Sequence, residues 1–237
     1  MKIFITIYDT VLWKPLLNGL IFLYNSLPWQ DLGLAIVIFT LLIRIILIPL
    51  FLKARDSQKK LTLIQPEIKK IQERFKNDRE GQSKALMELY AKHQTNPFSG
   101  CLVMLIQLPL LIALFQVLQK IGEVKSEFIY SFIKIPEIIS PISFGILDLS
   151  KGNLYLGVVA AVSQFVQIKM TMKPPVAGDK SDNSKSFNNM LQKQTLYVLP
   201  VLVLVWSYTF PAALILYWTI FNIVGILQEI IWKDKPR

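Results

Sequence analysis

The sequence predicts an all-α integral membrane protein, with five transmembrane helices around a polar groove, a cytoplasmic helical hairpin and an N-terminal interfacial amphipathic helix. Hydrophobic residues make up 53% of the chain, and the mean hydropathy of +0.44 is too high for an ordinary soluble domain. Apolar runs recur along the chain, and about twenty apolar residues are what a helix needs to cross a bilayer. The net charge of +10 lies mostly in the polar segments between these runs. The positive charge of a segment indicates on which side of the membrane that segment lies.

Residues 1–30 predict an amphipathic helix that lies in the membrane interface. Between residues 3 and 27 apolar side chains recur at helical spacing, and polar side chains are interspersed among them. Trp13 and Trp29 flank or interrupt the run, and indole rings favour the level of the headgroups. A poor spanning helix is the alternative. Polar residues and a proline break the early apolar run and no small-residue cleavage site follows, so we expect no cleaved signal peptide.

The first span, residues 31–53, contains the residue around which the other spans are predicted to be organised. From Leu32 to Leu52 the run is apolar except for Thr40 and Arg44, which lie inside it. An arginine at membrane depth costs at least about 2.5–3.5 kcal/mol, so Arg44 needs a buried partner or a water-filled cavity. A salt bridge is one interpretation, and Glu229 is the only acidic residue in the other apolar runs. The favoured interpretation is a hydrated groove whose charge meets an acidic ligand that binds and leaves.

Residues 54–95 predict a polar helical hairpin outside the membrane. From Lys53 to Thr95 the chain has eleven Lys or Arg residues against six Asp or Glu residues. Residues 77–82 have turn composition and separate two helical patterns. The apolar positions of both patterns are predicted to form a seam that pairs the two helices: Ile64, Ile68, Ile71, Phe75, Leu86, Leu89 and Tyr90. We expect His93 on the hairpin surface.

The remaining boundaries follow from the alternation of apolar and polar segments. They are a second span at 96–119, an external loop with short helices at 120–152, a third span at 153–170, a cytoplasmic linker at 171–194, a fourth and a fifth span at 195–210 and 211–232, and a cytoplasmic tail at 233–237. The hairpin segment counted from Lys53, the linker and the tail hold eleven, four and three basic residues, whereas the external loop is neutral. The positive-inside rule then places the N-terminus outside and the C-terminus in the cytoplasm. Spans of roughly sixteen residues favour local thinning of the bilayer.

Three stretches, in this order, carry a family resemblance. Residues 40–44 read Thr-Leu-Leu-Ile-Arg, with Pro49 after them, and residues 96–109 read Asn-Pro-Phe-Ser-Gly-Cys-Leu-Val-Met-Leu-Ile-Gln-Leu-Pro. Residues 211–222 read Pro-Ala-Ala-Leu-Ile-Leu-Tyr-Trp-Thr-Ile-Phe-Asn, and the third stretch ends at Gln228. With these stretches the chain resembles the YidC/Oxa/Alb family of membrane protein insertases along nearly its whole length. It resembles most the compact Gram-positive type of bacterial member, since neither a large external domain nor a long basic tail is apparent.

Two positions depart from the family pattern. Val103 stands where the family usually has a proline, and Phe221 stands where the first of two asparagines is expected. We expect that neither residue touches Arg44, so that both departures concern local packing.

The resemblance implies an insertase and chaperone for membrane proteins with short translocated tails. In the family an arginine sits in a hydrophilic groove open to the cytoplasm and to lipid, and Arg44 would be that arginine. Residues implied to line the groove or contact substrate are Thr40, Gln164, Tyr217 and Trp218, with Gln107 and Gln167 as further possibilities. The glutamines could equally bond helix to helix, and the two aromatic residues could belong to the interfacial belt.

The resemblance also implies partners and a location. They are nascent membrane proteins and the lipid bilayer, in a bacterial plasma membrane. The Sec translocon, a ribosome or a targeting receptor are candidate partners of the hairpin, and we expect no nucleic-acid site.

Two other classes of function compete with the insertase. A small anion transporter or channel would use Arg44 as its anion site, but no internal repeat is apparent. An enzyme would need a nucleophile with a base, or metal ligands, and no such pattern is found. The sequence has no phosphate-binding Gly-Lys-Ser/Thr loop, and Cys101 and His93 are the only residues of their types. We therefore expect no enzyme activity, no nucleotide hydrolysis, no cofactor and no metal.

Overall fold

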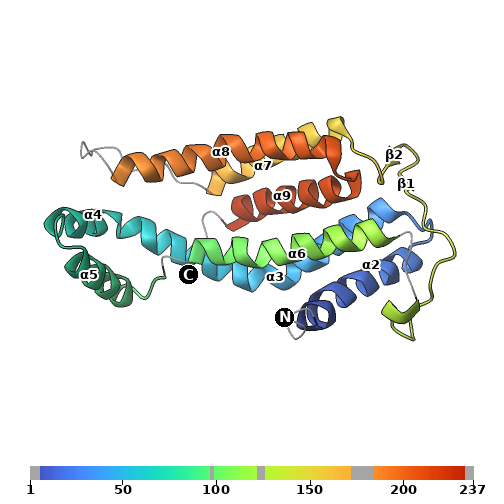
Figure 1. Ribbon diagram of the computed structural model, residues 1–237, viewed down its shortest axis with the longest axis horizontal. Helices are drawn as coiled ribbons and strands as arrows, with labels where there is room; N and C mark the ends of the chain where they lie inside the picture. The colour runs from blue at the N-terminus through green and yellow to red at the C-terminus, as the bar shows by residue number, and fades with distance from the viewer. Residues whose placement is uncertain (1–5, 97–98, 122–125, 172–183, 233–237) are drawn as a thin grey trace. The chain divides into compact units, whose positions relative to one another are not determined.

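The computed structural model describes residues 6–96, 99–121, 126–171 and 184–232 (Figure 1). The chain divides into two compact units. The larger unit combines residues 1–44 with residues 113–237, and the hairpin unit consists of residues 45–112. Both units are mainly helical.

The N-terminal helix of the larger unit packs its apolar face against protein. A π-helical turn, η1 (Asp9–Trp13), leads directly into α2 (Lys14–Ser26). The Trp13 ring meets the Phe128 ring edge-on, with the centroids 5.2 Å apart. The side-chain amide of Asn18 donates to the carbonyl of Phe128 at 2.9 Å. The helix that the sequence predicts is present, and its placement in the membrane interface stays a prediction.

Two long helices connect the units along the chain. α3 (Leu32–Leu63) begins in the larger unit and ends in the hairpin unit. α6 (Ser99–Lys120) begins in the hairpin unit and ends in the larger unit. α3 continues through Pro49, a break in the backbone hydrogen-bond pattern that membrane helices tolerate. The helix therefore extends well past residue 53, where the first span was predicted to end.

Three helices of the larger unit, α7 (Leu154–Thr171), α8 (Ser184–Thr209) and α9 (Ala212–Trp232), run alongside one another (Figure 1). Ala160, Val203 and Ile215 form a buried cluster with one residue from each helix. Only two residues separate α8 from α9, as the predicted tight hairpin requires. α8 begins earlier than expected, because no proline or glycine interrupts residues 184–199. Residues 184–194 of the predicted linker are thus helical, and residues 172–183 lie outside the described residues.

The predicted external loop contains a small β-hairpin that the sequence reasoning missed. After the short 3-10 helix η3 (Ser126–Phe128), strands β1 (Ile142–Ser143) and β2 (Leu147–Asp148) pair antiparallel. Phe144 and Gly145 turn the chain with φ of 51° and 73°. Asp31, just before α3, accepts hydrogen bonds from the Ser143 hydroxyl and, at 2.6 Å, from the backbone N–H of Phe144. The carboxylate thereby ties this hairpin to the beginning of α3.

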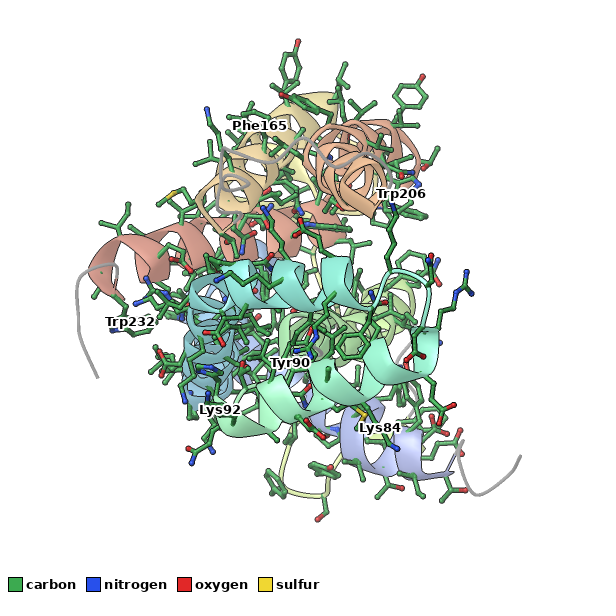
Figure 2. The ribbon with its side chains drawn as sticks, turned by 90° about the vertical axis from the view of Figure 1, so that its left-hand side faces the viewer. Lys84, Tyr90, Lys92, Phe165, Trp206 and Trp232 are labelled. Atoms are coloured by element: carbon green, nitrogen blue, oxygen red, sulfur yellow. The ribbon has the colours of Figure 1, made fainter. Side chains whose placement is uncertain are left out.

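The hairpin unit contains two short helices, α4 (Gln65–Arg74) and α5 (Arg79–Lys92). Asp78 caps α5, its carboxylate accepting from the backbone N–H of Gly81 at 2.9 Å. The two helices share an apolar cluster formed by Ile64, Ile68 and Leu89 with Leu61, Ile71, Leu86 and Tyr90. Of the predicted seam residues, Phe75 alone is not a member of this cluster. Figure 2 shows Lys84 and Lys92 extending from α5.

Within the part of the chain that the structure describes, three helices are long and apolar enough to cross a membrane: α3, α7 and α9. In the described part of α6 and α8, shorter apolar segments cover Gln107–Gln119 and Gln194–Thr209. The structure thus identifies an all-α membrane protein. The count of five spans stays a prediction.

Candidate functional site around Arg44

Arg44 is enclosed in the larger unit, with only 3% of its surface exposed. Its Nη1 donates a hydrogen bond to Oε1 of Gln228 at 2.9 Å. Its Nη2 donates to the backbone carbonyl of Phe221 at 2.7 Å. The guanidinium carbon also lies 3.5 Å from the centroid of the Phe221 ring, a cation–π contact. All three contacts come from α9, so this helix holds the buried charge with two neutral acceptors and an aromatic face.

The spacing on α9 explains how one helix supplies these contacts. Phe221, Gly225 and Gln228 stand four and three residues apart, so they share one helical face. At Gly225 an added Cβ would lie 2.8 Å from Nη2 of Arg44 and would clash with the side-chain amide of Gln167. The missing side chain therefore lets the guanidinium and this amide approach the α9 backbone together.

A second set of hydrogen bonds between side chains joins α7 to α9 near this site. The side-chain amide of Asn222 donates to the Ser163 hydroxyl at 3.2 Å. The Ser163 hydroxyl in turn donates to the carbonyl of Ala160 at 2.9 Å. One turn earlier on α9, the indole N–H of Trp218 donates to Oε1 of Gln164 at 2.6 Å. These contacts pair polar groups between apolar helices, where unpaired ones are costly.

Several residues predicted to line a groove are enclosed in this structure. Thr40 has no exposed surface, and its hydroxyl donates to the carbonyl of Ile36 at 2.6 Å. Tyr217 has no exposed surface either, and its ring centroid lies 5.9 Å from that of Phe221. The hydroxyl of Thr40 is thus satisfied within its own helix.

The three glutamines fall into different surroundings. Gln164 is bonded to Trp218, and Gln167 lies against Gly225 beside Arg44. Gln107 belongs to the hairpin unit, where it is half-buried. Of the possible lining residues, the structure therefore brings Gln167 to Arg44.

The sequence analysis named Tyr217 and Trp218 on α9 but missed the α9 residues that contact Arg44, and one expectation was wrong. Phe221 was expected not to touch Arg44, yet both its ring and its carbonyl do. Gly225 and Gln228 were not proposed as site residues. A signal was available, because Gln228 is a polar residue near the end of an apolar helix and shares a face with Phe221. Nothing in the sequence showed that this face meets α3.

Among the residues that the structure describes, no three His, Cys, Asp or Glu side chains gather where they could hold a metal ion. What the site offers is a buried cation, the guanidinium of Arg44. The two acceptors on α9 are neutral. A carboxylate could replace them, because its hydrogen bond to the guanidinium is charge-assisted and therefore stronger.

The fold and this site define a multispanning membrane protein with an arginine inside its helical bundle, and such intramembrane charges usually mark function. The chain belongs to the family of the 60Kd inner membrane protein, whose model matches residues 22–237. The resemblance to the YidC/Oxa/Alb insertases is thereby confirmed.

Individual relatives support this assignment. The chain is 34% identical to the membrane protein insertase YidC 2 of Bacillus anthracis, over 97% of this chain and 84% of that protein. It is 35% identical to the membrane protein insertase YidC of Fusobacterium nucleatum, over 84% of each chain. Against the YidC of Geotalea daltonii the identity is 33% over 93% of this chain, which spans only 37% of that relative.

A solved structure has the same fold. The chain matches an active YidC insertase crystal structure, in which the first transmembrane domain is resolved, with a TM-score of 0.57. The sequence identity is 25%, and the match covers 93% of this chain and 46% of the other.

Proposed function

We propose that this protein is a membrane protein insertase and chaperone that places proteins with short translocated tails into the bilayer without hydrolysing a nucleotide. The observation that carries the proposal is the buried guanidinium of Arg44, which is held by the neutral acceptors of Gln228 and Phe221. The relatives from Bacillus anthracis and Fusobacterium nucleatum, named as insertases and similar over 84% of their lengths, support it.

In the proposed mechanism, an acidic group in the translocated tail displaces the neutral acceptors from Arg44. Two unit charges 4 Å apart attract each other by about 4 kcal/mol at an effective dielectric of about 20. The tail crosses the membrane while the adjoining apolar segment enters lipid. Removing apolar surface from water provides the driving force, about 25 cal/mol per Å² of apolar surface buried. Because Arg44 is 3% exposed in this structure, the mechanism requires the site to open before a tail can reach it.

The groove is part of the proposal. It would open to the cytoplasm and to lipid, with Arg44 as its central charge. Its lining would include Thr40, Gln164, Tyr217 and Trp218, with Gln167 as a further member. We place the protein in the bacterial plasma membrane with five spans, the N-terminus outside and the C-terminus in the cytoplasm. Nascent membrane proteins are the proposed substrates.

The hairpin unit would dock an acidic partner such as a segment of the Sec translocon, a targeting receptor or a ribosomal protein. A shallow cleft of about 450 Å³ lies between α4 and α5. Its lining combines apolar and mostly basic side chains: Ile71, Phe75, Ala85 and Leu89 with Lys70, Arg74, Lys92 and Glu88. This composition fits a segment with an apolar anchor and flanking carboxylates.

The decisive test is insertion of a single-span substrate with an acidic tail into vesicles that contain the protein. Protease protection of the tail measures insertion. We expect Arg44→Ala to abolish insertion and Arg44→Lys to retain part of it, because lysine keeps the charge without the planar fork. A matched substrate with a neutral tail should depend less on Arg44. Undiminished insertion by Arg44→Ala for every substrate would overturn the role of the charge, and uptake of a small anion by the same vesicles would favour the transporter instead.

A further inference from the structure

We infer that Phe221 and Gly225 form a seat on α9 that positions the guanidinium of Arg44. This seat sets how readily an acidic segment of a substrate can bind the guanidinium. The effect on insertion rests on the proposed function, whereas the positioning of Arg44 does not. Neither residue was expected to have this role. Both act through Arg44, so they are positioning residues and not groups that bind the substrate.

The Phe221 ring provides one half of the seat. The guanidinium carbon lies 3.5 Å from the ring centroid, which is the distance of a stacked contact. Such a contact holds a cation without supplying a hydrogen-bond acceptor, and it is strengthened where water is excluded. The backbone carbonyl of the same residue supplies an acceptor at 2.7 Å. A carbonyl oxygen has two lone pairs, so it can accept from Arg44 in addition to its own helix.

Gly225 provides the other half by leaving space. A methyl group there would lie 2.8 Å from Nη2 of Arg44 and would also press on the amide of Gln167. Since the backbone cannot easily yield inside a packed helix, the flexible arginine and glutamine side chains would have to move. The seat therefore depends on a stacking ring at position 221 and on the absence of a side chain at position 225.

The seat has a specific consequence for substrate exchange. Each contact that holds Arg44 must be given up, at least in part, when a carboxylate binds it. A weaker seat should therefore let a substrate carboxylate bind Arg44 more easily. It should also leave the guanidinium less well positioned to assist transfer of the tail across the membrane. We expect variants of the seat to lower both the half-saturating substrate concentration and the maximal insertion rate. A purely structural defect would lower the maximal rate alone.

The first experiment measures the position of Arg44 without any substrate. The full chain in lipid vesicles is treated with phenylglyoxal, which modifies guanidinium groups, and the rate of modification at Arg44 is followed by peptide mass spectrometry. We expect Phe221→Leu and Gly225→Ala to raise this rate roughly three- to tenfold, a range that matches the strength of cation–π contacts. Phe165→Leu is the matched control, since Phe165 lies on α7 (Figure 2) and its ring pairs with that of Tyr197 instead.

The outcomes separate the seat from folding and from the proposed function. If Gly225→Ala does not fold, judged by its thermal melting, Phe221→Leu decides the matter alone. An unchanged rate at Arg44 in Phe221→Leu, or an equal rise in Phe165→Leu, would overturn the seat. Titration of the acidic-tailed substrate then tests the joint fall in half-saturation and maximal rate. If Arg44→Ala inserts normally while Phe221→Leu still exposes Arg44, the seat stands and the proposed function fails.

Discussion

The two units place positive charge in opposite surroundings. In the hairpin unit the lysines and arginines stand mostly on the surface of α4 and α5, around a small apolar cluster. In the larger unit Arg44 is enclosed, and its hydrogen-bond partners and stacking ring are defined atom by atom. Solvated charges act through their number and summed field, whereas a buried charge acts through geometry. A charge in the hairpin can therefore be exchanged for a similar one at little cost, whereas Arg44→Lys should retain only part of the function.

The units also differ in what holds them together. The hairpin helices meet through branched and aromatic side chains such as Ile64, Ile68 and Tyr90. In the larger unit, α7 approaches α8 so closely that a Cβ at Gly157 would clash with the side chain of Ser207. Small residues allow such close approach between membrane helices, where van der Waals contact replaces the hydrophobic driving force.

The largest expected effect follows from this close approach. We expect Gly157→Leu to destabilise the protein by about 1–3 kcal/mol, because overpacking at a tight helix contact forces the helices apart. The neighbouring Val158→Leu is the control, since Val158 is 48% exposed. Thermal melting in detergent measures both. Equal melting temperatures would show that α7 and α8 tolerate separation, and the contrast in packing between the units would not hold.

A smaller effect on stability, with a large one on binding, is expected in the hairpin unit. Reversing Lys70, Arg74 and Lys92 to glutamate should change the free energy of unfolding by no more than about 0.5 kcal/mol per site, because exposed charges contribute little. Binding of an acidic peptide with an apolar anchor, measured by fluorescence anisotropy at low salt, should be lost. The reversal of Lys84, which is outside the cleft lining, serves as the control. Undiminished binding would remove the cleft from the proposal.

The smallest effect is expected at the ion pair in the loop before α7. Lys151 lies 2.8 Å from Asp148, and hydrogen bonds from Lys151 and Ser150 lower the pKa of Asp148 to about 2. A lowered pKa means that the pair contributes stability above the ordinary pKa of the carboxyl, about 4, and that this contribution is lost as the pH falls toward 2. Both side chains are solvated, so Asp148→Asn should barely change the melting temperature at pH 7. Titration of the carboxyl carbon by NMR would detect an ordinary pKa if the pair does not form.

Local patterns allowed much of this fold to be predicted. The hairpin seam follows from helical periodicity, and most of its predicted members meet in one cluster because a short turn joins their helices. The tight connection of α8 and α9 follows from Pro211 between two apolar runs. Arg44 could be singled out because its cost in a span depends only on its own run of sequence. The β-hairpin of the loop was missed, since strands of two residues carry too little pattern to be recognised.

The sequence by itself determined that this is a helical membrane protein with a buried arginine, and its motifs determined the family. Only the tertiary structure decided that Phe221 stacks on Arg44, that Gly225 makes room for it, and that Thr40 and Tyr217 are enclosed. The physical reason is the range of the interactions. Burial of an apolar run is decided within a few helical turns, whereas the partner of Arg44 lies 177 residues away and depends on which face of α9 meets α3.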